Sequence, residues 1–163
     1  CLAAMGLATI WQLALAKSAV STGPSLGWAL ADGLSASALL GLTMAAMLLG
    51  HWYLNSPGMQ LRPLRRLIVL GGISVALRAL LVASGLWCLL NTGYSPSFAF
   101  WATLGLRWLA GLVGIAGLEW MTWQTLKIPN TQSATGILYV AVIFSFLGEL
   151  AGQLLAAGQS FPL

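Results

Sequence analysis

Long apolar stretches, separated by short polar connections, dominate the chain. Five of them approach or exceed the roughly 20 residues that a helix needs to cross the hydrocarbon core of a bilayer. They cover residues 2–20, 27–54, 67–90, 98–126 and 136–158. None has the strict alternation of a membrane β-barrel strand. The pattern predicts an all-α, polytopic transmembrane bundle of about five antiparallel spans with short loops, forming a single transmembrane helical domain over residues 1–163.

Composition supports lipid as the solvent for most of this chain. Of its 163 residues, 59% are hydrophobic and 6% are charged, whereas a soluble domain is about 25% charged. The formal net charge is +4, but the seven lysines and arginines form no long basic stretch. We therefore expect an anionic membrane surface, and not nucleic acid, as the partner of the positive charge.

The polar connections predict an orientation. Arg62, Arg65 and Arg66 lie in the connection 55–66, and Lys127 begins the connection 127–135. These two connections fall on one side of the membrane, whereas the turns on the other side contain no lysine or arginine. The positive-inside rule then places the amino terminus in the cytoplasm and the carboxyl terminus on the opposite side. Alternatively, the arginine cluster binds an anionic headgroup or a cytoplasmic partner.

All three acidic residues of the chain fall inside predicted spans. These are Asp32, Glu119 and Glu149, and the spans also contain Lys17, Arg78 and Arg107. A charge at the centre of a bilayer costs at least about 2.5–3.5 kcal/mol, so such groups face the bundle interior and pair with one another.

Depth along the helices predicts which charges pair. Lys17 and Asp32 flank the first turn, and Arg107 and Glu149 lie at matching depths in consecutive spans. We therefore expect a Lys17–Asp32 pair and an Arg107–Glu149 pair. Arg78, near the centre of the third span, is expected to reach Glu119 or to share Glu149.

Small residues accompany several of these charges. Gly148 and Gly152 form a GxxxG pair beside Glu149, and Gly71 and Ser74 share a face with Arg78. Small residues allow transmembrane helices to approach closely. At 3.6 residues per turn, Glu119 lies about 120° from Arg107 around the fourth span, which predicts that it meets a different neighbour or another subunit.

His51, the single histidine, ends the second span close to Trp52 and Tyr53. It shares a helix face with Gly33 and Gly41, so a flat quinone, haem or chlorin could approach there and take His51 as ligand or hydrogen-bond donor. The alternative is a hydrogen-bonded histidine in an interfacial aromatic cluster. With one histidine and two cysteines, the chain cannot form a four-ligand zinc site from these residue types, and no catalytic triad can be assembled.

Three functions remain open from the sequence. The first is a non-catalytic subunit of a larger membrane complex, such as one of electron transport. The second is a small ion- or proton-coupled transporter that uses the buried arginine and glutamate pairs. The third is a membrane anchor that contributes His51 to a quinone, haem or chlorin site.

Overall fold

The structure is a computed structural model that describes residues 26–55, 60–91, 97–128 and 130–157. Within those ranges every element is helical: α2 (Leu26–Asn55), α3 (Arg62–Asn91), α4 (Phe98–Leu106), the π-helix η1 (Arg107–Gly114), α5 (Ile115–Thr125) and α6 (Thr131–Ala157). α4, η1 and α5 form one continuous rod. Four helices are therefore long and apolar enough to cross a membrane, against the five spans predicted, and the expected span 2–20 lies outside the described residues.

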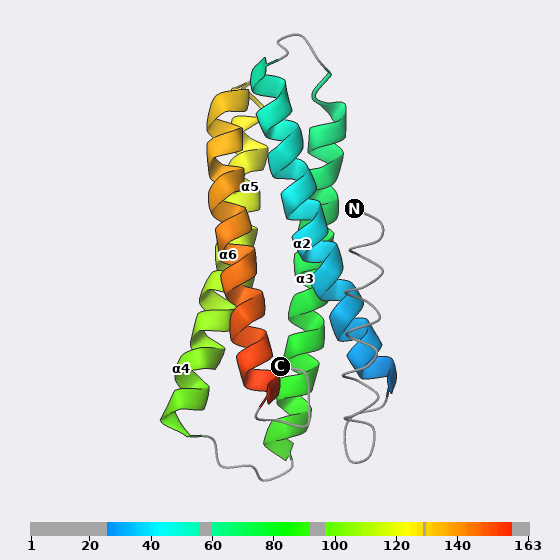
Figure 1. Cartoon of the computed structure of the whole chain (residues 1–163), viewed down its shortest axis with the longest axis vertical. Helices are drawn as coiled ribbons and strands as arrows, with labels where there is room; N and C mark the ends of the chain where they lie inside the picture. Colours follow the sequence, from blue (N-terminus) through cyan, green and yellow to red (C-terminus); the bar gives the residue numbers. More distant parts are fainter. Residues whose placement is uncertain (1–25, 56–59, 92–96, 129, 158–163) are drawn as a thin grey trace.

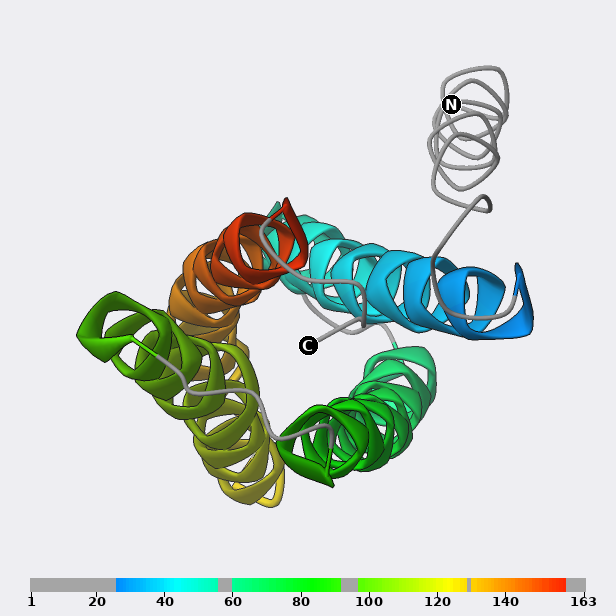
Figure 2. The same cartoon turned by 90° about the horizontal axis from the view of Figure 1, so that it is seen from below.

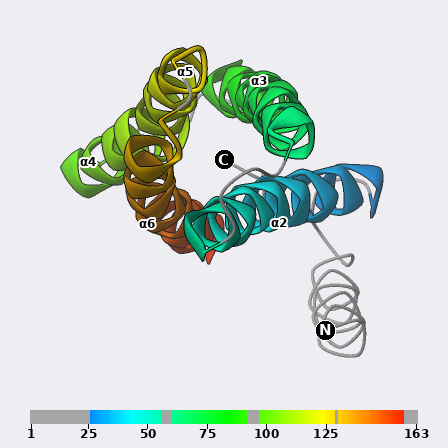
Figure 3. The same cartoon turned by 90° about the horizontal axis from the view of Figure 1, so that it is seen from above.

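The four long helices run alternately up and down and pack side by side (Figure 1). Seen along the bundle, they form a ring in which α2 contacts α3 and α6, and the α4–η1–α5 rod contacts α6 and α3 (Figures 2 and 3). Connections of a few residues favour this antiparallel order, because each helix can return only beside its predecessor. The core of the bundle is thus shared by all four described spans.

Two helices begin earlier than hydrophobicity alone predicts. α3 starts at Arg62, where position 67 was expected, and Pro63 occupies its first turn, where a missing N–H has no cost. α6 starts at Thr131, where position 136 was expected, and the backbone N–H of Ser133 donates to Asn130 Oδ1 at 3.1 Å, which caps the helix. Apolar stretches mark the bilayer, whereas caps mark the ends of helices.

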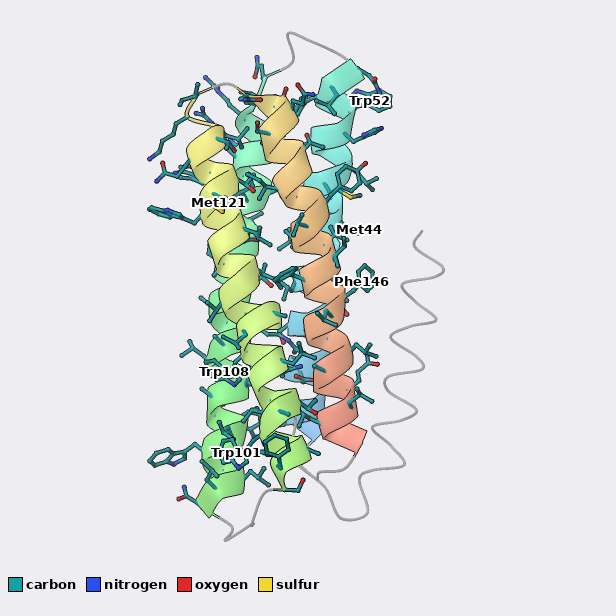
Figure 4. The ribbon with its side chains drawn as sticks, turned by 90° about the vertical axis from the view of Figure 1, so that its left-hand side faces the viewer. Met44, Trp52, Trp101, Trp108, Met121 and Phe146 are labelled. Atoms are coloured by element: carbon teal, nitrogen blue, oxygen red, sulfur yellow. The ribbon has the colours of Figure 1, made fainter. Side chains whose placement is uncertain are left out.

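The outer surface of the spans is apolar, and four charged residues, Arg78, Arg107, Glu119 and Glu149, are buried between them. Large side chains such as Leu34, Leu80 and Leu109 are exposed along the spans, whereas Arg78 and Arg107 are buried. Aromatic residues lie near both ends, with Trp52 toward one end and Trp101 toward the other (Figure 4). A surface of this kind is suited to lipid, and the four long helices are compatible with insertion into a membrane.

Candidate functional site

The side chain of Arg78 is the centre of a buried charged network. Its Nε donates to Glu149 Oε1 at 2.8 Å and its Nη2 donates to Glu149 Oε2 at 2.7 Å, which is the bidentate arrangement of a strong arginine–carboxylate pair. Its Nη1 donates to Asp32 Oδ1 at 2.7 Å and to Ser35 Oγ at 2.8 Å. One guanidinium therefore joins α2, α3 and α6.

The network differs in exposure between its two acids. The side chain of Asp32 is 33% exposed, whereas that of Glu149 is 11% exposed and that of Arg78 is 3% exposed. Asp32 also offers its backbone carbonyl to Arg78 Nη1 at 2.7 Å. The network therefore reaches from the bundle interior to its edge at α2.

Arg107 lies beside this network without joining it through a carboxylate. Its Nη1 donates to the carbonyl oxygen of Gly148 at 3.4 Å, and its Nε has no hydrogen-bond partner among the described groups. A side chain at Gly152 would overlap the Arg107 guanidinium. The GxxxG pair of α6 thus provides the surface on which this buried arginine lies.

The predicted Arg107–Glu149 pair is wrong, and the predicted Lys17–Asp32 pair lies partly outside the described residues. Glu149 pairs with Arg78 and not with Arg107, because the Arg78 fork engages both of its oxygens. Asp32 pairs with Arg78, whereas its expected partner Lys17 lies outside the described residues. Of the alternatives expected for Arg78, the structure shows the one in which it binds Glu149.

Glu119 occupies the bundle interior on its own. It is 6% exposed, and among the described residues its Oε2 has no hydrogen-bond partner. Its carboxylate lies against Gly71 of α3, where any Cβ would collide with Oε1. The neighbour of Glu119 is therefore α3, and the absence of a side chain at Gly71 is what makes room for the carboxylate.

The π-helix explains why Arg107 and Glu119 both face inward. With α-helical spacing they would be about 120° apart. The eight residues Arg107–Gly114 are π-helical, and each of them turns the chain through a smaller angle because its hydrogen bonds span five residues. The smaller rotation per residue removes most of the 120° angle between the two side chains, so Glu119 faces the interior.

A row of polar groups follows the inner face of α3. Gly71, under Glu119, is followed one turn later by Ser74 and one turn after that by Arg78, and all three are buried. Ser74 Oγ has no hydrogen-bond partner in the described part of the chain. The row therefore leads from an unpaired carboxylate to the Arg78 network over a helical rise of about 10 Å.

Two elements of this interior were not expected from the sequence. Ser35 accepts from Arg78 Nη1, and the hydroxyls of Thr43 and Ser145 lie 3.4 Å apart between α2 and α6. Ser35 lies one turn after Asp32, so helical spacing from that acid is the signal that would have found it.

His51 faces outward from α2, and its Nδ1 lies 3.3 Å from the hydroxyl of Tyr139 on α6. The two rings meet edge to face, at 87° and a centroid separation of 6.4 Å. Both residues are exposed. This geometry matches the hydrogen-bonded aromatic alternative and also leaves the histidine accessible; no described group of histidine, cysteine and carboxylate residues could hold a metal ion.

The basic cluster lies at the end of the bundle where α3 begins. Arg65 Nη2 donates to the carbonyl oxygen of Leu126 at 2.7 Å, which links the start of α3 to the end of α5. Arg62, Arg66 and Lys127 are exposed. The two basic connections are therefore on the same side of the bundle.

Comparison of the chain with models of protein families, with characterised proteins and with solved structures finds no match.

Proposed function

We propose that this protein is a small ion- or proton-coupled transporter whose path follows the buried polar row from Glu119 to the Arg78 network. The observation that carries the proposal is the unpaired carboxylate of Glu119. The two positive charges of Arg78 and the neighbouring Arg107 match the two negative charges of Asp32 and Glu149, and a purely structural role in helix registration would account for them. Glu119 has no such partner in the described chain, and a lone buried charge in a membrane is costly.

A carboxylate in this position has a chemical use. Uptake of a proton or a cation cancels the charge that makes burial of the carboxylate costly. Glu119 can therefore bind the ion when the path opens to one side of the membrane and release it when the path opens to the other. Ser74 Oγ, Arg107 Nε and Trp108 Nε1 are also buried without hydrogen-bond partners in the described ranges. Internal water usually satisfies such groups, and water between them would extend the path toward the network.

Flux through the reconstituted protein tests the proposal. Liposomes that enclose a pH-sensitive dye and carry an imposed membrane potential are expected to acidify faster with the protein than without it. Glu119→Gln should reduce this rate at least tenfold, because the amide cannot take up the proton. Repeating the flux measurement with a sodium or a potassium gradient in place of the proton gradient identifies the transported ion.

The matched control is Thr103→Val, which removes a hydroxyl that bonds to Ala99 of its own helix, away from the row. Its flux should equal that of the wild type. A wild-type protein with no flux of any of the three ions, or a Glu119→Gln protein with unchanged flux, would refute the transporter.

The orientation forms part of the same proposal. We infer that the end carrying Arg62, Arg65, Arg66 and Lys127 faces the cytoplasm, as short basic connections favour. This inference predicts that an impermeant maleimide applied to intact cells labels Asn91→Cys and leaves Gln60→Cys unlabelled, each in a background without Cys1 and Cys88. The reverse labelling pattern would show that the bundle has the opposite orientation in the membrane.

The outer face of α2 favours a second candidate, a subunit of a larger membrane complex that serves electron transport. Ser37, Gly41 and Met44 are exposed along it, and His51 follows at its end. Small residues invite close approach of another helix, and an accessible histidine suits a quinone, haem or chlorin held by a partner. Native purification decides: copurifying subunits and an absorption spectrum that changes in His51→Ala support this candidate, and a colourless protein that purifies alone removes it.

A further inference from the structure

A groove of about 290 Å³ lies between α3 and α5 on the side of Glu119. Its walls are mostly apolar and include Ile68, Gly72, Val75, Ala116, Trp120 and Trp123. Trp120 is exposed on the outer surface of the bundle. Glu119 also lines the groove, so an apolar hollow on the membrane-facing surface reaches a buried acid.

No described residue binds the carboxylate of Glu119. Glu119 is more than nine-tenths buried, and neither an ion pair nor a hydrogen bond from a described residue reaches it. Gly71 and Gly72 form the part of α3 that faces it, and neither brings a side chain. A ligand in the groove could therefore approach the carboxylate without displacing a protein partner.

We propose that this groove binds an organic ammonium ion with apolar substituents. Three features select this class: the carboxylate supplies the opposite charge, the apolar walls accept the substituents, and two tryptophans line the groove, whose indole rings attract cations. A lipid acyl chain would fill the same space and leave the acid unpaired. Such a cation would be a transported substrate only if the protein is a transporter, as proposed above.

Two probes of the same shape test the charge. Benzyltrimethylammonium and its uncharged carbon analogue neopentylbenzene are offered in radiolabelled form to the protein in nanodiscs of phosphatidylglycerol, which contains no ammonium group. Equilibrium dialysis against empty nanodiscs gives the binding by the protein alone. The cation is expected to bind saturably and at least tenfold more tightly than neopentylbenzene.

Three variants locate the site. Glu119→Gln should weaken binding of the cation at least tenfold and leave binding of neopentylbenzene unchanged. Gly72→Leu should weaken both probes, because Gly72 lines the groove and its Cβ would meet nothing closer than 3.5 Å, so the larger side chain fits and occupies the space. Gly117→Leu, on an exposed face of α5 with nothing within 4 Å, should change neither.

Each contrary result has a distinct meaning. Equal affinity for the two probes would make the groove an apolar cleft for a lipid chain, and no saturable binding would refute the site; either result overturns the inference while leaving proton or metal-ion flux untouched. Binding as expected without any flux in liposomes would uphold the groove and refute the transporter. Helical circular dichroism of every variant, equal to that of the wild type, excludes misfolding as the cause of a loss.

Discussion

Arg78→Met is expected to lower the free energy of unfolding by about 3–5 kcal/mol, the usual cost of removing one partner from a buried ion pair. The Arg78 side chain is 3% exposed, and its guanidinium donates two hydrogen bonds to the Glu149 carboxylate and one to the Asp32 carboxylate. Methionine keeps the length and apolar character of the stem, so the loss comes from the two acids left behind. Glu149 is the more costly of them because it is the more buried.

Reversible unfolding in mixed micelles measures this loss. The control is Arg66→Met, an exposed arginine on the same helix, for which a change within about 0.5 kcal/mol is expected. Arg78→Met combined with Glu149→Gln should recover part of the stability, since the amide removes the uncompensated charge. Equal stability of Arg78→Met and the wild type would show that the network is not formed in the membrane.

Gly148→Leu is expected to separate η1 from α6 and to cost about 1–3 kcal/mol or more, the range for overpacking a well-packed core. Gly148 and Gly111 face each other so closely that a Cβ on Gly111 would lie 2.7 Å from the Gly148 Cα. Backbone cannot move aside as a flexible side chain can. Because Arg107 donates to the Gly148 carbonyl, separation of the helices also removes the contact that holds this buried arginine.

The same unfolding assay has a matched control in α6. Gly136 has nothing within 4 Å of its Cβ position and is exposed, so Gly136→Leu should change stability by no more than about 0.5 kcal/mol. If both variants unfold alike, the close approach of η1 and α6 does not contribute to stability.

The sequence could predict the helices and the interior position of the charges, because both follow from the cost of polar groups in lipid. It offered the Arg78–Glu149 pair only as an alternative, and it assigned Glu149 to Arg107 instead. Depth along an axis can be counted from residue numbers, and Arg107 and Glu149 do lie beside each other on neighbouring helices. Direction around an axis depends on every residue being α-helical, and the π-helix Arg107–Gly114 breaks that assumption.

The Arg78 network shows a second limit. Its guanidinium reaches two acids on two different helices. Because the arginine side chain is long, the depth of its Cα along the helix axis does not determine which acid it binds. Ser35 and the Asp32 carbonyl complete the set through contacts that no apolar or charge pattern records. By contrast, the glycines at positions 71, 148 and 152 were expected on packing faces, and the structure places each against a neighbouring helix or a buried charge.

The π-helix has a consequence for how the fourth span can change over evolutionary time. Loss of one residue between Arg107 and Glu119 would turn everything on one side of the deletion by about 100° relative to the other. One of the two charges would then leave the interior and face the acyl chains. Substitutions along this stretch are constrained only where a side chain touches a neighbouring helix, but its length is constrained throughout, so insertions and deletions should be tolerated in the connections and rejected here.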